Sequence, residues 1–266
     1  MGKRTGRKTD EGIGRVVVWS DQHFPYHDEQ AHEAIYEFAE YVQPDVHLHI
    51  GDCLNLGGIS RHVQDDLIQQ YEEPVLEGLL SFGRHINHLC ETSPESEIIW
   101  IWGNHEERLR AFVRKHPSWR GIIDDPLGLL EYFGKVKDAR KIIRLVILDD
   151  STDDYKIGKM HYCHGFSACK HTAAKHVEDY GESVTFGHSH TMQLFTAVRR
   201  SKPIAGYCVG HLMSKEGRRY LKGRPHRWVT GFGYMEYLKR TGQYTMHLLP
   251  IIDGKFIYGK VYGCST

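Results

Sequence analysis

Three features are missing from this 266-residue sequence, and each absence excludes a class of protein. The chain has no net charge, because 34 Lys and Arg balance 34 Asp and Glu, so it is not a polycation that binds nucleic acid or membrane with its whole surface. Its six cysteines form no CxxC pair, which argues against a disulfide framework and favours buried, reduced thiols. No apolar run approaches a signal peptide or a membrane span, so we expect a soluble cytoplasmic protein with no membrane partner.

What the sequence does contain is a rhythm of short apolar strands and amphipathic helices, with no repeat and no long linker. Strands are expected at 15–20, 45–50, 97–102, 141–148, 156–163 and 183–186. Helices are expected from an Asp28 cap to just before Pro44, over 63–90 with a break at Pro74, within 105–133 and near 168–180. This alternation indicates a sheet with helices on its faces, and after residue 191 antiparallel strands dominate. We interpret residues 1–266 as a single domain with a disordered basic tail, residues 1–12.

Side chains that bind ligands stand at the ends of five of these strands. They occur in the segments Asp21-Gln22-His23, Gly51-Asp52, Gly103-Asn104-His105-Glu106, His164-Gly165 and Gly187-His188-Ser189-His190. One such segment alone is usually a helix cap or a surface turn. In open α/β sheets, however, ligands bind at the carboxyl ends of the strands, so five of these loops should converge on one spot. The pair His188 and His190 has too few ligands to hold a metal alone, and would be the last part of that shared site.

This series of motifs, in this order, resembles the calcineurin-like metallophosphoesterase family, which includes purple acid phosphatases, Ser/Thr protein phosphatases, cyclic-nucleotide phosphodiesterases and a nuclease of double-strand-break repair. The resemblance implies an α/β fold with four layers, an α/β/β/α sandwich of mixed sheets flanked by helices, with two metal ions at one edge. It implies the following ligands: Asp21, His23 and His190 on one ion, Asn104, His164 and His188 on the other, and Asp52 bridging both.

The residue types also fit that chemistry on their own. Imidazole, carboxylate and amide oxygen suit divalent ions of hard or borderline character, so we expect two per chain, manganese first and iron or zinc as alternatives. Such ions lower the pKa of bound water from ~15.7 towards 7, and a bridging hydroxide would attack phosphorus in line. In the family pattern His105 faces the substrate and protonates the leaving alkoxide. We expect Asp52 and Asn55 to complete the catalytic set, and Asn104 and Arg108 to contact the substrate together with His105.

The segment after the second strand departs from the family pattern. Ser/Thr phosphatases carry GDxVDRG, in which the second Asp orients the acid histidine and the Arg clamps a phosphomonoester. This chain has GDCLNLGG, with Asn55 and Leu56 at those positions, so the clamp is missing. We expect the Asn55 amide to accept a hydrogen bond from His105 without raising its pKa as a carboxylate would. Arg61 or Arg108 would supply a replacement cation, although a surface salt bridge is an equal alternative for each.

A basic segment, residues 199–227, stands out against the neutral whole. Nine Lys or Arg residues lie between Phe195 and Trp228 against one acid, Glu216, and aromatic residues are interleaved with them. This mixture suits phosphate contacts and base stacking, so nucleic acid is a candidate partner. An exposed strand edge protected by Lys and Arg is an equal alternative.

Other side chains of the same types are interpreted as packing. His47 and His49 have the spacing of His188 and His190, but they lie inside a strand rather than after it, so we expect them to be buried and hydrogen-bonded. Trp100 and Trp102 alternate within a strand and are expected in the core.

The function we expect is a dinuclear metal-dependent phosphoesterase, most of all a phosphodiesterase or nuclease acting on nucleic acid or nucleotides. A phosphomonoesterase acting on a small molecule or a protein is the first alternative. A non-catalytic metal-binding scaffold is the second, but it predicts eroded ligands, and all seven ligand positions and His105 are intact.

Overall fold

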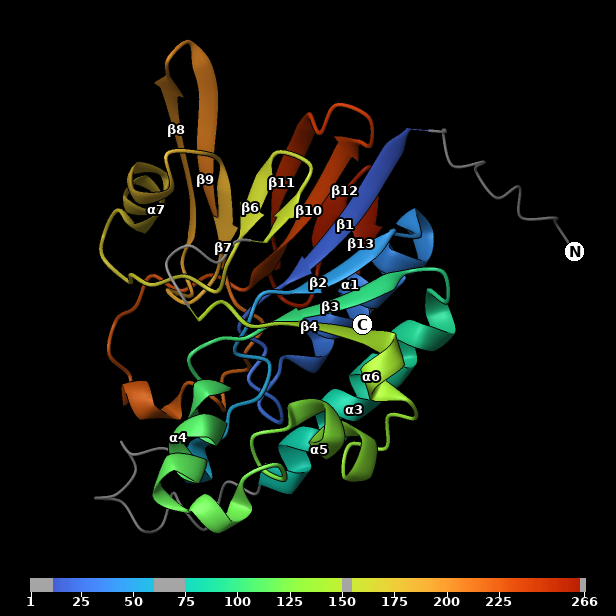
Figure 1. Cartoon of the computed structure of the whole chain (residues 1–266). Helices are drawn as coiled ribbons and strands as arrows, with labels where there is room; N and C mark the ends of the chain where they lie inside the picture. The colour runs from blue at the N-terminus through green and yellow to red at the C-terminus, as the bar shows by residue number, and fades with distance from the viewer. Residues whose placement is uncertain (1–11, 60–74, 150–154, 264–266) are drawn as a thin grey trace, which may run out of the picture.

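The computed structural model describes residues 12–59, 75–149 and 155–263. Within them two β-sheets pack face to face, and helices lie on the outer side of each sheet (Figure 1). The expected basic tail, apart from Gly12, and Arg61 lie outside the described residues. Among the described helices, none combines the length and the apolar character that crossing a bilayer requires. The cytoplasmic location and the single domain stay predictions.

The first sheet has six strands in the order β11-β10-β1-β2-β3-β4. Its strands are β1 (Ile13–Trp19), β2 (Val46–His49), β3 (Glu97–Ile101), β4 (Ile143–Val146), β10 (Gly231–Leu238) and β11 (Tyr244–Pro250). From β1 to β4 neighbouring strands are parallel, whereas β10 is antiparallel to both β1 and β11. The polar loops after β1, β2 and β3 therefore emerge at the same edge.

The second sheet has the order β5-β6-β7-β9-β8. Its strands are β5 (Lys156–Ile157), β6 (Met160–Tyr162), β7 (Val184–Phe186), β8 (Met192–Arg199) and β9 (Lys202–Val209), and a separate ribbon is made by β12 (Phe256–Tyr258) and β13 (Lys260–Tyr262). The inner strands β6, β7 and β9 are parallel, and the edge strands β5 and β8 are antiparallel to their neighbours. The expectation of more antiparallel pairing after residue 191 is confirmed.

Alternation along the central strands divides the core into layers. In β1, Val17 and Trp19 pack with the helices, whereas Val16 and Val18 pack with the second sheet. The helices are α1 (Glu29–Val42), α3 (Val75–Thr92), α4 (Glu107–Lys115), α5 (Pro126–Tyr132), α6 (Ala139–Ile142) and α7 (Thr172–Tyr180), with short 3₁₀ turns η1 (Gly57–Ile59), η3 (Pro117–Trp119) and η4 (Arg219–Leu221). Helices α1, α3, α5 and α6 contribute to the first layer, and α7 packs on the far side of the second sheet. The four-layer α/β/β/α sandwich is confirmed.

The helix α1 forms as its sequence predicts. Asp28 is the N-cap and accepts a hydrogen bond from the backbone N–H of Ala31 at 3.1 Å. The helix ends at Val42, and Gln43 takes a left-handed conformation before Pro44. The amphipathic pattern fixes which face enters the core, since Ile35 and other apolar residues at helical spacing are buried.

Two expected strands are wrong in detail. Residues 156–163 form a hairpin, β5 and β6, rather than one strand, because Gly158 turns the chain with φ of +61°. Lys141 and Ile142 end the helix α6, so the strand β4 begins only at Ile143. The predicted helix over 63–90 lies partly outside the described residues, and its described part begins just after Pro74.

The packing predictions for the strand side chains are confirmed. His47 and His49 have no exposed surface; Trp19 Nε1 donates to His47 Nδ1 at 3.2 Å. Trp100 and Trp102 are both buried in the core. None of the described cysteines is in a disulfide. Most of them are buried, but Cys169 is exposed, against the expectation of buried thiols.

Candidate metal centre

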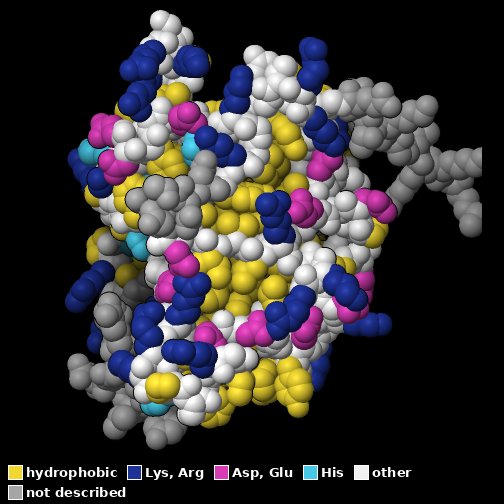
Figure 2. Space-filling view, in the orientation of Figure 1, with side chains coloured by type: hydrophobic (Ala, Val, Ile, Leu, Met, Phe, Trp, Pro, Cys, Tyr) yellow, Lys and Arg dark blue, Asp and Glu magenta, His cyan; other side chains and the backbone are white. Residues whose placement is uncertain are grey.

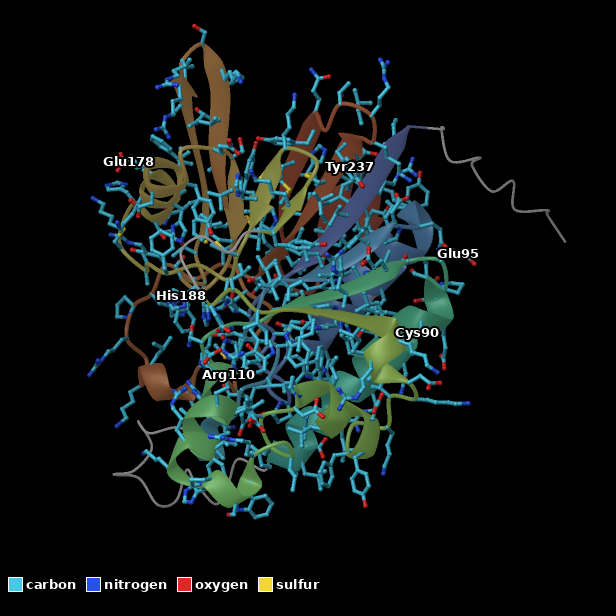
Figure 3. The ribbon with its side chains drawn as sticks, viewed as in Figure 1. Cys90, Glu95, Arg110, Glu178, His188 and Tyr237 are labelled. Atoms are coloured by element: carbon cyan, nitrogen blue, oxygen red, sulfur yellow. The ribbon has the colours of Figure 1, made fainter. Side chains whose placement is uncertain are left out.

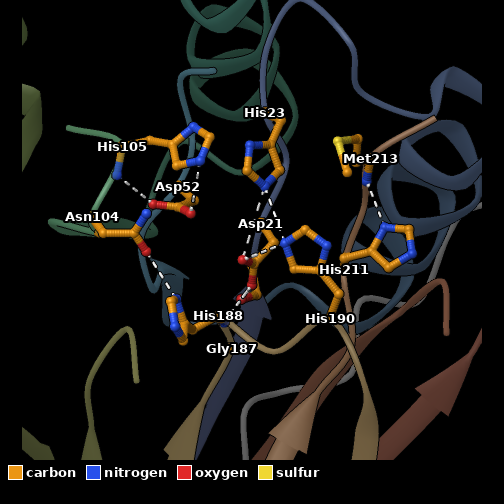
Figure 4. A network of polar contacts seen from close by, with 12 residues as sticks. Asp21, His23, Asp52, Asn104, His105, Gly187, His188, His190, His211 and Met213 are labelled. Carbon is orange, nitrogen blue, oxygen red and sulfur yellow. Dashed lines mark hydrogen bonds and ion pairs between the residues drawn. The ribbon is translucent and has the colours of Figure 1, made fainter. Parts of the chain in front are cut away.

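The loops after β1, β2, β3, β6 and β7 meet at one edge of the sheets, and their polar side chains face one another (Figure 4). A first group consists of Asp21, His23 and His190. The Nε2 atoms of the two histidines lie 3.2 Å apart, and Nε2 of His190 lies 3.0 Å from Oδ1 of Asp21. All three side chains are buried, and their ligand atoms lie within 4.8 Å of one another. This group could hold a metal ion.

A second group consists of Asn104, His164 and His188. The amide oxygen of Asn104 lies 2.9 Å from His164 Nε2 and 2.8 Å from His188 Nδ1. His164 donates from Nδ1 to the backbone carbonyl of Ile50 at 3.0 Å, so in the neutral ring the lone pair of Nε2 faces the amide oxygen. Two acceptor atoms this close need positive charge between them, from a proton or from a metal ion. The second group therefore also fits a divalent cation.

Asp52 lies between the two groups. Its Oδ2 atom is 3.4 Å from His164 Nε2 and 3.7 Å from His105 Nε2, and its Oδ1 atom accepts a hydrogen bond from the backbone N–H of His105 at 2.8 Å. It forms one compact cluster of ligand atoms with Asp21 and His164, and another with His23 and His105. This is the position that a ligand shared by two ions would need.

Both carboxylates stay ionised at neutral pH although they are buried. Burial raises the pKa of Asp21, but His190 more than reverses this and holds the pKa below its usual range. Burial acts in the same direction on Asp52, and His105 and His164 bring its pKa well below the usual value. Burial lowers the pKa of His164, but Asp52 outweighs burial and raises it to about 10. The centre thus draws positive charge to His164, where a metal ion would supply it.

The backbone at this edge is unusual for residues other than glycine. Five expected ligands have φ between 49° and 63°: Asp21, His23, Asp52, His188 and His190. This left-handed region is uncommon outside glycine, and it is retained only where surrounding structure enforces it. Two glycines make the close approach possible, because a Cβ atom at Gly103 would collide with Asp52 and one at Gly187 would collide with Asp21.

The contact predicted between Asn55 and His105 is wrong in one respect. His105 donates from Nδ1 to the backbone carbonyl of Asn55 at 2.6 Å, not to its amide. Arg108 donates to the same carbonyl at 2.7 Å and to Nε2 of His105 at 2.8 Å. Nε2 is therefore an acceptor here. Burial lowers the pKa of His105 to about 4; Asp52 opposes the shift and Arg108 adds to it. Arg108 thus contacts the expected acid rather than open solvent.

Sequence reasoning did not assign a role to Glu106, although it is part of the third motif. Its carboxylate is fully buried and accepts hydrogen bonds from the backbone N–H groups of Asp52, Leu54 and Gly103, at 3.0, 3.0 and 2.8 Å. It therefore ties the loop after β2 to the loop after β3. The sequence did contain a signal for this role. Glu106 directly follows the candidate ligands Asn104 and His105 and does not belong to the apolar pattern of the strand before them.

Gln22 was also missed. It sits between Asp21 and His23 in the chain but points away from them into the helical layer. Its amide oxygen accepts from His49 Nδ1 at 2.9 Å, and its Nε2 atom lies 2.9 Å from Nε2 of His32. A buried side chain with two histidine partners holds the first motif in place from behind.

The basic segment divides into two parts. Arg199, Arg200 and Lys202 lie at the outer end of the β8–β9 hairpin, where Figure 2 shows Lys and Arg side chains gathered. Eight strand residues at about 3.3 Å each separate this tip from the metal centre by roughly 26 Å. The rest lies in the loop between β9 and β10, and that loop leaves and returns beside the centre: Trp228 packs 4.2 Å from the ring of His190.

No family model matches this chain. Two similar curated proteins are both called Gene 54 protein. The one from Mycobacterium phage D29 is 24% identical over 263 residues and covers 91% of this chain and 95% of its own length. The one from Mycobacterium phage L5 is 22% identical over 263 residues and covers 93% and 98%.

Several solved structures are similar in outline. Vacuolar Protein Sorting 29 from Cryptosporidium parvum covers 95% of this chain and all of its own, with 11% identity and a TM-score of 0.48. Vps29 of Entamoeba histolytica complexed with zinc covers 93% and 95%, with 13% identity and a TM-score of 0.40. YfcE, a phosphoesterase from E. coli, covers 88% and 98%, with 13% identity and a TM-score of 0.38. All three scores lie below 0.5, so we base the proposed function on the residues of this chain.

Proposed function

We propose that this chain is a calcineurin-like metallophosphoesterase that hydrolyses phosphate esters with two divalent ions. One observation carries the proposal: imidazole, carboxylate and amide side chains from five strand ends, most of them buried, bring their ligand atoms within 2.8 to 4.0 Å of one another. In the proposed arrangement the first group holds one ion, the second group holds another, and Asp52 contacts both. Bound ions of this kind polarise a phosphoryl oxygen and supply a water of lowered pKa.

The protein's own residues would then orient the ester and move the proton. The amide oxygen of Asn104 faces His164 and His188, so its amide N–H₂ group would donate to a phosphate oxygen. His105 lies 3.7 Å from Asp52 and would protonate the leaving oxygen. For that, Nε2 must carry a proton, which requires Arg108 to move from Nε2 to the incoming phosphate anion. Arg108 would thus act as the cation that replaces the missing phosphatase clamp.

The segment after β2, GDCLNLGG, favours a diester as the substrate. Leu56 stands where Ser/Thr phosphatases have their clamp, and it is buried in the core. A monoester dianion would therefore depend on Arg108 as its one replacement cation, whereas a diester carries a single negative charge and needs less compensation. The loop between β9 and β10, in which Trp228 packs on His190, carries Lys215, Arg218 and further cations, which suits the flanking phosphates of a nucleic acid.

The proposal is tested with two chromogenic esters. Purified protein is assayed with bis(p-nitrophenyl) phosphate and with p-nitrophenyl phosphate, without metal and with added manganese, iron or zinc. Faster hydrolysis of the diester would support a phosphodiesterase. Faster hydrolysis of the monoester would show that the protein is a phosphomonoesterase instead. Silence with every metal would mean that the chain is a non-catalytic metal-binding scaffold.

The nucleic-acid partner has its own test, with a control that the fold provides. Arg218 and Arg219 lie in the loop beside the centre, whereas Arg199 and Arg200 lie at the hairpin tip. Changing the first pair to Glu should weaken polynucleotide binding and lower the slope of log affinity against log salt by about 1 to 2. The same change at the tip should leave both unaltered. Equal effects at the two places would instead favour edge protection or a nonspecific charge effect.

A further inference from the structure

A cavity of about 600 Å³ opens directly beside the second ligand group. Asn104 and His164 form its inner end. The other side chains on its wall are mostly aromatic or aliphatic: Trp102, Ile147, Leu148, Cys163, Phe166 and Tyr180. Figure 3 shows His188 above Arg110 on this side of the molecule. The cavity residues come from the ends of strands and from α4 and α7. Its volume lies in the range of small-molecule sites.

Phe166 packs on a histidine although half of its surface is exposed. Its exposed fraction is 51%, which is high for a phenylalanine. Behind it lies His176, 4.0 Å away between ring centroids, and His176 in turn stacks on the buried Phe186 at 3.7 Å and 7°. The backbone N–H of Phe166 donates to His176 Nε2 at 3.2 Å, and His176 donates from Nδ1 to the backbone carbonyl of Thr172 at 2.8 Å. The ring therefore has His176 packed against it and forms part of the cavity wall.

The two carboxylates on the cavity wall disfavour a second phosphate group there. Apart from His164 at the ligand group, the cavity's charged lining residues among those described are two carboxylates, Glu107 and Asp149, and the Lys175 ammonium lies 5.7 Å from the ring centroid of Phe166. Arg110 pairs with both, at 3.3 and 2.5 Å, and lies 4.8 Å over the ring of Trp102. The guanidinium is therefore engaged by the carboxylates, and a phosphate entering the cavity would meet negative charge. A planar, uncharged group meets aromatic faces instead.

We propose that this cavity binds the base and sugar of a nucleotide ester whose phosphate lies at the metal centre. This inference rests on the proposed function, because the ligand groups fix the phosphate at the inner end of the cavity. It also specifies how the substrate is oriented: the nucleoside extends from the second ligand group towards Phe166. Further phosphates extend the other way, past His190 and Trp228 to the basic loop between β9 and β10.

The test measures binding, which needs no turnover. Manganese-loaded protein is titrated by calorimetry with adenosine 5′-monophosphate and with ribose 5-phosphate, which share the phosphate and the sugar but differ in the base. One stacked base should make the nucleotide bind about 5- to 150-fold more tightly. Equal affinity for the two ligands would overturn the inference.

Variants at Phe166 locate the effect. Phe166→Ala removes the ring, and Phe166→Leu keeps bulk against His176 but removes the aromatic face. Both should bring the nucleotide affinity down to that of ribose 5-phosphate, while ribose 5-phosphate affinity and metal content stay unchanged. Phe133→Ala is the matched control, since this phenylalanine is also exposed but lies at the end of α5. A Leu variant with the full preference for the nucleotide would contradict stacking at this position.

Failure of this inference can be told apart from failure of the proposed function. If the protein hydrolyses chromogenic diesters but binds both phosphates equally, the cavity assignment is wrong and the phosphoesterase stands. If it hydrolyses no ester but still prefers the nucleotide through Phe166, the cavity is a nucleotide site in a protein without the proposed activity.

Discussion

Two regions of this molecule are rich in histidine, and only one of them is arranged to bind metal. Behind the first motif lies a buried cluster of His32, His47, His49 and His85 around Gln22. Its members are paired with an amide, an indole and a phenol: Gln22, Trp19 and Tyr36. At the metal centre, in contrast, imidazole nitrogens face carboxylate and amide oxygens. In the first region the histidines have neutral polar partners, whereas at the metal centre imidazole nitrogens lie close to carboxylate and amide oxygens and to one another.

The difference teaches that histidine content alone does not make a metal site. Burial depresses the pKa of His47 and of His32 to about 3, so the cluster stays neutral. In the metal centre Asp52 outweighs burial and raises the pKa of His164 to about 10. Carboxylates are what turn a set of buried imidazoles into a place for a cation.

The largest effect should come from Asp52, which lies between the two ligand groups. Asp52→Ala should reduce the metal content from two ions per chain towards zero and lower the esterase rate more than ~100-fold, the upper end for residues that only support ligands. Metal content by mass spectrometry and the rate with bis(p-nitrophenyl) phosphate check this. Asp253→Ala, at an exposed carboxylate, is the control. A variant that retains two ions would refute the shared-ligand role.

Next in size is His105, which separates binding of metal from chemistry. His105→Gln should lower kcat by roughly 10²- to 10⁴-fold, the usual range for general acids, with metal content near normal. The loss should grow as the leaving group becomes a poorer one, which a series of substituted phenyl esters measures. An equal loss across the series would show that His105 does not donate the proton.

Gln22 connects the two regions and should give an intermediate effect. Gln22→Ala removes the partners of His49 and His32, so metal affinity should fall about 10- to 100-fold and the free energy of unfolding by about 1 to 3 kcal/mol. Competition with a chelator and urea denaturation measure the two quantities. Gln30→Ala, at an exposed glutamine in α1, should change neither. Lower stability with unaltered metal affinity would mean that the cluster does not support the centre.

The smallest expected effect is on how the free energy of unfolding changes with acid, and it involves the buried histidine cluster rather than the metal centre. The pKa of His47 is depressed to about 3 in the folded chain, and an unfolded histidine has a pKa of about 6.5. Between these values the unfolded state binds more protons, so stability falls as pH drops below 6.5, by up to about 1.4 kcal/mol per pH unit. His47→Gln should remove this part of the slope.

Urea denaturation at pH 7.5, 6.5 and 5.5 compares the slopes. His171→Gln, at an exposed histidine outside the cluster, serves as the control and should retain the original slope. If the His47 variant loses stability with acid as steeply as the original chain, burial of that ring does not govern the acid response.

Much of this fold could be predicted because its local signals agree. Strand ends with ligand residues, the Asp28 cap and the alternation along the central strands all indicated the same layered sheet. The hairpin at Gly158 was missed because the apolar pattern of 156–163 continues through the turn. A periodicity of apolar residues reports burial, and both strands of this hairpin are partly buried.

The candidate site was predicted at the level of residue types, and its finer contacts were not. The Asn55 backbone carbonyl rather than its amide faces His105, which no sequence pattern specifies because every residue has that carbonyl. Two further features depend on how distant segments pack. Glu106 joins the loops after β2 and β3 by hydrogen bonds, and the tip of the β8–β9 hairpin lies apart from the basic loop between β9 and β10. Such contacts need the three-dimensional arrangement.

The left-handed backbone at five ligand positions limits how this centre can change. Among side chains that bind metal, Asp, Asn and His tolerate that conformation best, so substitutions compatible with folding keep oxygen or imidazole donors in place. A lineage carrying this chain could therefore exchange one hard or borderline ion for another by small steps. Conversion to a thiolate site would first require the loops themselves to be rebuilt.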